Sequence, residues 1–95
     1  MQDLKELRAQ LKQGLTREST ADILSFIGYQ VNRDYKFKLR ADEKTPSASI
    51  RNDGYIRDFG SDWGGDVVAL LHEYHGQTLP DAVKYVADCL GVWYE

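Results

Sequence analysis

The segment ASIRNDGYIRDF (residues 48–59) determines the fold class, because it has the pattern of two strands joined by a tight turn. Apolar and polar side chains alternate over residues 48–51, which is typical of a half-buried strand. Asn52-Asp53-Gly54 favours a hairpin turn, since these residue types tolerate positive φ. Residues 55–59 then return as the partner strand.

A further strand is predicted upstream, where YKFKLR (residues 35–40) alternates strictly. Its two faces carry different chemistry, with Tyr35, Phe37 and Leu39 on one side and Lys36, Lys38 and Arg40 on the other. Residues 42–47 cannot continue this strand because Pro46 lacks a backbone donor. Together with the hairpin, the pattern predicts an antiparallel meander.

Two helices are predicted before the sheet. Leucines at positions 4, 7, 11 and 15 recur at helical spacing, and Gly14 marks the end of that helix. A second helix is expected to begin near Ser19, with Ser19 and Asp22 as a pair similar to a capping box, and to stop at Gly28.

Two more helices are predicted after the sheet. Residues 60–65 have the composition of a turn-rich loop carrying Trp63, and Asp66 then caps a helix that Gly76 ends. The last helix opens at Leu79-Pro80-Asp81 and stops at Gly91. The expected fold is therefore α+β, with a small antiparallel sheet of three or more strands flanked by N- and C-terminal helices.

Length and composition limit the classes of protein to which the chain can belong. The chain has 95 residues, 42% of them hydrophobic and 28% charged, which predicts one globular domain over residues 1–95. No apolar run approaches the roughly 20 residues that cross a bilayer, and residues 1–6 lack the apolar core of a secretory signal. The single cysteine, Cys89, excludes an internal disulfide and is expected to be a small core side chain. These features predict a cytoplasmic protein with no membrane partner.

Charge is unevenly distributed along the chain. The formal net charge of -3 argues against a strong nucleic-acid binder, but residues 33–57 carry +3 and residues 58–95 carry −6. The basic side chains expected to follow a phosphate backbone are Lys36, Lys38, Arg40, Lys44, Arg51 and Arg57. Tyr55 and Trp63 would offer rings on which unpaired bases stack. The alternative is that exposed strands carry Lys and Arg for solubility and to discourage edge pairing.

Several short motifs, in order, resemble a known family. They are ADIL (residues 21–24), EKTPS (43–47), FG (59–60), GGDV (64–67), LLHEYHG (70–76) and LPDAV (79–83). Over residues 20–91 the chain resembles the zinc-ribbon (CHC2) domain of bacterial DnaG-type DNA primases, and residues 1–18 form an additional N-terminal helix. The resemblance implies a role in replication or priming: binding single-stranded DNA beside a primase, polymerase or helicase, as a standalone protein or within a longer chain. A phage or another mobile element is a plausible origin.

The family's metal ligands are not retained. The motifs place Lys38, Ala41, Asp58 and Ser61 where the family has three Cys and one His, and none of these supplies a thiolate or imidazole for zinc. The chain is therefore expected to be a degenerate, metal-free member without a cofactor. We expect a Lys38–Asp58 ion pair with Ser61 bonding nearby, and apolar packing by Phe37, Phe59, Trp63 and the first helix, to replace the metal.

No catalytic constellation is visible, and the family's separate magnesium-binding catalytic module has no counterpart in these residues. The chain is thus expected not to be an enzyme by itself and to have no small-molecule substrate. His72 and His75 lie one residue short of the His-Glu-x-x-His zinc motif and predict an exposed polar stripe. Gly64-Gly65 predicts a tight turn rather than a phosphate cradle. The alternative function is a protein-interaction adaptor without DNA binding, using the first helix or Trp93 and Tyr94.

Overall fold

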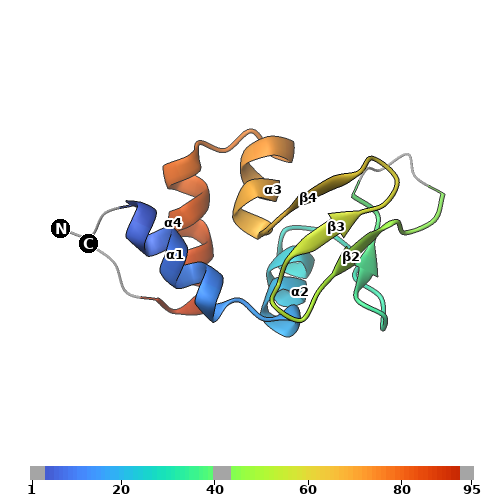
Figure 1. Cartoon of the computed structure of the whole chain (residues 1–95), viewed down its shortest axis with the longest axis horizontal. Helices are drawn as coiled ribbons and strands as arrows, with labels where there is room; N and C mark the ends of the chain where they lie inside the picture. The colour runs from blue at the N-terminus through green and yellow to red at the C-terminus, as the bar shows by residue number, and fades with distance from the viewer. Residues whose placement is uncertain (1–3, 40–43, 93–95) are drawn as a thin grey trace.

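The structure, a computed structural model, describes residues 4–39 and 44–92. In this part of the chain the sheet lies toward one end, the first and last helices lie at the other, and the two remaining helices lie between them (Figure 1). The elements in order are α1 (Leu4–Gly14), α2 (Arg17–Phe26), β1 (Lys36–Phe37), β2 (Ala48–Ile50), β3 (Ile56–Asp58), β4 (Trp63–Gly65), α3 (Val67–Tyr74) and α4 (Leu79–Leu90). The α+β class, with helices on both sides of a small antiparallel sheet in the sequence, is confirmed.

The four strands form an antiparallel meander in the order β1-β2-β3-β4. Their register aligns side chains in rows across the sheet, and each row faces one side. One row consists of Phe37, Ala48, Asp58 and Trp63, and its neighbour of Lys36, Ser49, Arg57 and Gly64. Because Phe37, Ala48 and Asp58 are buried whereas Lys36 is exposed, the first row faces the helices and the second faces outward.

The hairpin turn forms as the sequence predicts. Gly54 has φ 84°, and its N–H donates to the carbonyl of Arg51 at 2.9 Å. The turn also packs on α2, because a Cβ added at Gly54 would lie 2.8 Å from Thr20 Oγ1. Glycine is therefore needed here both for its backbone conformation and for the close approach of a helix.

The predicted strand over residues 35–40 is much shorter in the structure. The strand is limited to Lys36–Phe37, and before it Tyr35 has φ 57° and donates its N–H to the carbonyl of Asn32 in a turn. The Tyr35 carbonyl still accepts from the N–H of Ile50 in β2 at 2.9 Å. Arg40 lies outside the described residues. The loop expected over residues 60–65 is also corrected, because Trp63–Gly65 pairs with β3 as a fourth strand. Glycine is unfavourable in strands, but at position 64 it makes room for a neighbouring ring, because a Cβ at Gly64 would lie 2.2 Å from Tyr55 Oη.

Helix boundaries follow their caps. The cap predicted at Ser19 is wrong by one turn: Thr16 is the N-cap, its Oγ1 accepts from the N–H of Ser19, and the Ser19 hydroxyl accepts from the N–H of Thr16. Asp66 caps α3 as predicted, its carboxylate accepting from the N–H of Ala69 at 2.9 Å. Thr78 caps α4, and Gly91 ends it at φ 71°.

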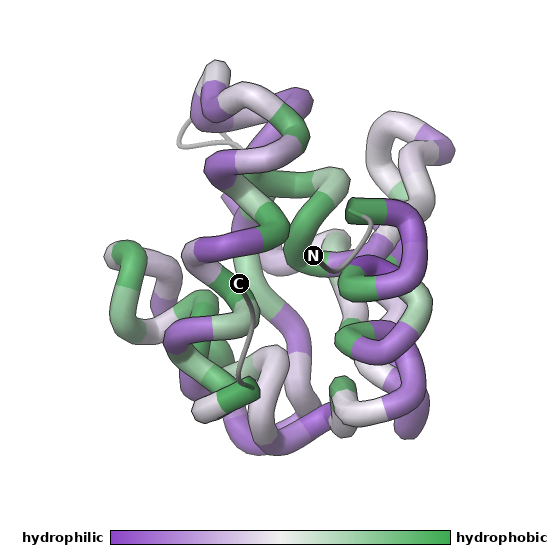
Figure 2. The backbone as a smooth tube through the Cα atoms, turned by 90° about the vertical axis from the view of Figure 1, so that its left-hand side faces the viewer, coloured by the Kyte–Doolittle hydropathy of each residue, from purple (hydrophilic) through white to green (hydrophobic). Residues whose placement is uncertain are grey.

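One hydrophobic core joins the four helices to the inner side of the sheet, and hydrophobic segments alternate with hydrophilic ones along the helices (Figure 2). Its fully buried side chains include Leu11, Leu24, Phe37, Ile50, Ile56, Leu70 and Val86. Two predicted core residues are corrected: Cys89 is exposed, and the Phe59 side chain is 72% exposed. No helix within residues 4–39 and 44–92 is long and apolar enough to cross a membrane.

Candidate nucleic-acid interface

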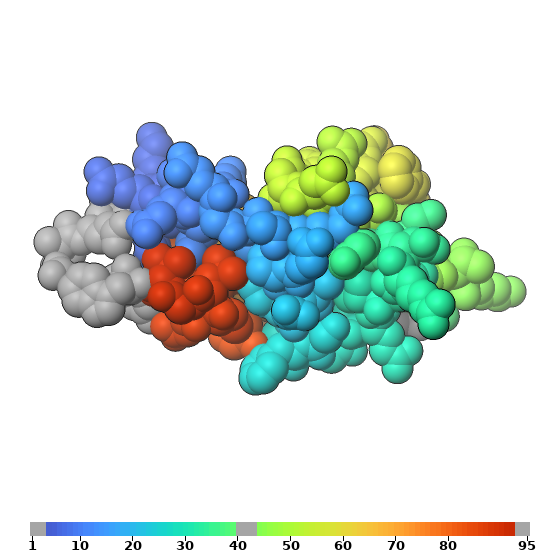
Figure 3. Space-filling model, turned by 90° about the horizontal axis from the view of Figure 1, so that it is seen from below, coloured from blue at the N-terminus to red at the C-terminus, as the bar shows by residue number. Residues whose placement is uncertain are grey.

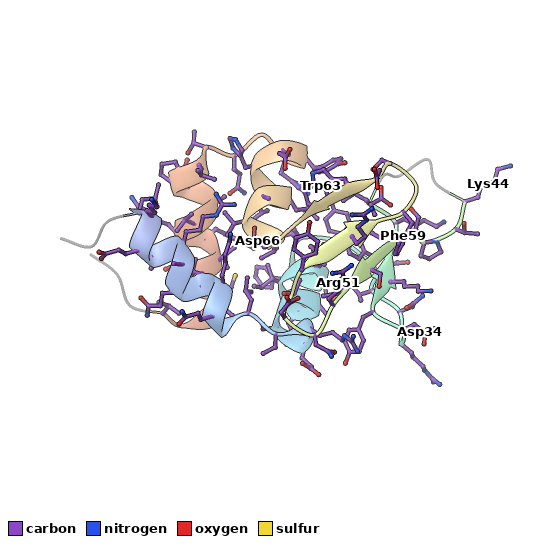
Figure 4. The ribbon with its side chains drawn as sticks, in the orientation of Figure 1. Asp34, Lys44, Arg51, Phe59, Trp63 and Asp66 are labelled. Atoms are coloured by element: carbon purple, nitrogen blue, oxygen red, sulfur yellow. The ribbon has the colours of Figure 1, made fainter. Side chains whose placement is uncertain are left out.

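The solvent-facing side of the sheet brings together basic and aromatic side chains, which we call the outer face: Lys36, Arg51, Tyr55, Arg57 and Phe59. Lys36 and Arg57 share one row of the register, and the others follow by alternation on either side of it. Figure 4 shows Arg51 and Phe59 toward opposite ends of the β2–β3 hairpin. The sheet therefore spreads these side chains along its length.

Two arginine–aromatic pairs are the main feature of this face. The Arg51 guanidinium lies 5.6 Å from the centroid of the Tyr55 ring, and that of Arg57 lies 5.9 Å from the centroid of Phe59. Tyr55 is 37% exposed and Phe59 72% exposed. Each pair thus presents a ring for stacking and a cation for a phosphate in the same place.

Gly64, which lies opposite Arg57 in the register, leaves space for the Tyr55 ring. The Tyr55 hydroxyl lies so close to Gly64 that any larger residue at that position would displace the ring. Phe59 was expected to pack inside, although alternation with the buried Ile56 and Asp58 already places residues 55, 57 and 59 on one side. Alternation is the sequence signal by which Phe59 belongs to this face.

Arg57 also forms an ion pair with Asp62. Both side chains are more than one third exposed. An exposed pair of this kind contributes about 0–1 kcal/mol. A phosphate can therefore compete with Asp62 for the guanidinium.

The other predicted interface residues lie elsewhere. Lys38 is exposed and lines a cleft of about 620 Å³ together with Tyr29, Pro46 and His75. Lys44 projects from the far end of the molecule in Figure 4. Trp63 is on the helix side of the sheet, where its Nε1 donates to Glu73 Oε2 at 3.1 Å. Its ring packs edge-on against Tyr74, with the ring centroids 5.4 Å apart. The predicted site is thus only partly assembled on one face.

Two of the four positions at which the motifs predict metal ligands, Asp58 and Ser61, lie in one hydrogen-bonded cluster. The buried Asp58 carboxylate accepts from the hydroxyls of Ser47 and Ser61, with the Ser47 distance 2.6 Å, and from the N–H of Gly60 at 3.3 Å. The Ser61 contact is confirmed. The expected Lys38–Asp58 ion pair is wrong, since no ion pair joins these two described residues. Ala41 lies outside the described residues.

The two histidines are exposed, as predicted, and bond in different directions. His72 Nδ1 lies 2.8 Å from the carbonyl of Gln77, whereas His75 Nε2 lies 2.9 Å from the Tyr29 hydroxyl. Burial raises the pKa of Tyr29, with repulsion from Tyr74 as the smaller cause, so the phenol keeps its proton at neutral pH and can donate it to His75. Among residues 4–39 and 44–92, no three His, Cys, Asp or Glu side chains gather at one place.

Comparison of the chain with protein-family models, curated proteins and solved structures finds no match. The resemblance to the primase zinc-ribbon family therefore remains a prediction from the motifs.

Proposed function

We propose that the chain binds single-stranded DNA through the outer face, as a non-catalytic accessory to DNA replication or priming. The observation that carries the proposal is the pair of exposed rings, Tyr55 and Phe59, each with an arginine over it on the same side of one hairpin. Stacking platforms interleaved with cations are the usual means of binding unpaired bases and their backbone.

The spacing of the rings supports a short binding site. Four residues along a strand span about 13 Å, so the two rings could each stack on a different base of one short single-stranded segment. Bases can reach these rings only when they are unpaired, so we expect single strands to bind more tightly than a duplex. Lys36 and Ser49 lie beside Arg57 in the register and extend the polar surface toward β1.

The electrostatic contribution is modest. The outer face carries Lys36, Arg51 and Arg57, which would neutralise about three phosphates and give a salt slope of about −2 on a logarithmic plot for a single strand. The acidic segment 58–95 contains α3 and α4 and is expected to keep DNA away from the helical end.

The assignment to replication rests on the motifs over residues 20–91. They imply a primase, polymerase or helicase as partner, supplied in trans or in a longer chain, and a cytoplasmic location. In the family these motifs mark a domain that assists synthesis without catalysing it. We expect no nucleotide polymerisation by this chain alone.

The test is anisotropy of a labelled single-stranded oligonucleotide, with a duplex of the same sequence for comparison. Because base stacking on an aromatic ring contributes about 1–3 kcal/mol, Phe59→Ser is expected to weaken binding about 5- to 150-fold. Phe26→Ser is the matched control, since Phe26 is equally apolar, 81% exposed and on a different surface. Equal binding by both variants would show that stacking on Phe59 does not contribute to the affinity for single-stranded DNA.

A further inference from the structure

A second surface lies between α2 and α4, where an open groove of about 450 Å³ has a largely apolar lining. Ile23 and Phe26 form one wall, and Tyr85 and Cys89 form the other. Figure 3 shows α4, in red, beside α2 on this face. The groove shares no residue with the outer face, so the two surfaces can be tested separately.

Phe26 is the most exposed large apolar side chain among the described residues, at 81%. It is the last residue of α2 and lies one turn beyond Ile23, so both side chains line the same side of that helix. Tyr85 and Cys89 are likewise one turn apart on α4. Exposed apolar surface bounded by polar residues marks interaction sites in monomeric proteins.

The rim of the groove is acidic. Asp22 on α2 and Asp88 on α4 line it, and neither carboxylate forms an ion pair within the described part of the chain. No described Lys or Arg contributes to the lining. The surface is therefore complementary to an apolar segment flanked by positive charge.

A second copy of this chain fits the groove poorly. Symmetric pairing would place the same surface against itself, which would bring two copies of Asp22 and Asp88 together. Like charges facing each other across an interface oppose association. Charge therefore favours a different, basic occupant.

We propose that this groove docks an amphipathic helix of a partner protein, with apolar side chains at i, i+3 or i+4 spacing and Lys or Arg beside them. Helix-in-groove recognition uses such anchors. Phe26 and Tyr85 would pack against the anchors, and Asp22 and Asp88 would pair with the flanking cations. The chain would then hold single-stranded DNA on its sheet and a protein on its helices.

The probe for the test is a designed peptide of about 16 residues, long enough to form a helix, with Leu on one face and Lys and Arg beside it. A counterpart carries Glu in place of every Lys and Arg. Titration of each peptide into the labelled full chain, followed by amide NMR spectra, is expected to shift the signals of Ile23, Phe26, Tyr85 and Cys89 with the basic peptide only. Shifts confined to other surfaces, or equal binding of the acidic peptide, would overturn the proposal.

Two variants, each with a control, make the result specific. Phe26→Ser is expected to lower the affinity for the basic peptide at least about tenfold, whereas Phe59→Ser is expected to leave that affinity unchanged. The double variant Asp22→Lys with Asp88→Lys is expected to reverse the preference toward the acidic peptide, and Glu18→Lys, exposed on α2 outside the groove lining, is its control. Retention of the basic preference in the double variant would contradict the role of the rim.

Sedimentation of the free chain tests the remaining alternative, in which a second copy of the chain occupies the groove. A monomer at the titration concentration supports the proposal, and a dimer that Phe26→Ser abolishes would overturn it in favour of a second copy. Loss of DNA binding in the Phe59→Ser variant and loss of peptide binding in the Phe26→Ser variant report on different surfaces. Failure of either proposal is therefore visible without the other.

Discussion

The sheet end and the helical end of the molecule each contain a buried carboxylate, and the two are satisfied differently. Asp58 in the sheet accepts from two serine hydroxyls and a backbone N–H. Asp66, at the start of α3, caps the helix, lies 3.8 Å from the Arg8 guanidinium and has a second buried oxygen without a hydrogen-bond partner.

This difference shows how the two ends are stabilised. The helical end relies on apolar side chains from four helices, and Asp66 adds a helix cap and a contact with Arg8. The sheet end has apolar packing on one side only and adds a polar cluster at the ends of β2 and β3. Its other side carries the aromatic and basic residues of the outer face.

The largest expected effect contrasts a buried leucine with an exposed phenylalanine. Leu24→Ala removes a fully buried side chain and is expected to lower the free energy of unfolding by about 2–5 kcal/mol. Phe59→Ala, on the outer face, is expected to change it by no more than about 0.5 kcal/mol. Urea unfolding followed by circular dichroism measures both. A large loss in Phe59→Ala would mean that the outer face is part of the core.

The next comparison is between the two carboxylates. Asp58→Ala leaves the Ser47 and Ser61 hydroxyls without this acceptor and is expected to cost about 1–3 kcal/mol of unfolding free energy. Asp66→Ala removes a helix cap, with an expected cost of about 0.5–2 kcal/mol. A smaller loss at Asp58 than at Asp66 would contradict the view that the polar cluster holds the sheet end.

Much of this arrangement follows from local sequence signals. The hairpin depends on Asn52-Asp53-Gly54, whose turn chemistry is contained in the residues themselves, and the leucine spacing of α1 is equally local. β4 and the side on which Trp63 lies depend instead on pairing with β3 and on docking against α3. Alternation placed Lys38 and Arg40 beside Lys36, but β1 ends at Phe37, so that pattern stops two residues into the strand.

A smaller effect is expected at alkaline pH. Burial raises the pKa of Tyr29 in the folded state above its ordinary value of 10.0. The stability from this group is therefore complete below pH 10.0 and is lost as pH rises through the raised pKa. Unfolding free energies measured on both sides of that value should fall less in Tyr29→Phe than in the parent chain. An identical fall would show that this phenol makes no contribution.

The smallest expected effect is that of a chelator. Asp58 stands where the motifs place a zinc ligand, and its carboxylate accepts hydrogen bonds from the hydroxyls of Ser47 and Ser61. We therefore expect EDTA to leave the melting temperature unchanged and elemental analysis to find no stoichiometric zinc. A fall in melting temperature with EDTA would contradict the metal-free account of the sheet end.

The central claim is that the outer face binds single-stranded DNA, and the salt dependence of oligonucleotide anisotropy tests it most directly. We expect binding whose logarithmic salt slope is about −2. Arg51→Glu is expected to weaken binding and to reduce the size of that slope by about 1. Lys84→Glu, exposed on α4, is expected to leave both unchanged. Absence of binding at low salt, or equal effects of the two variants, would contradict the claim.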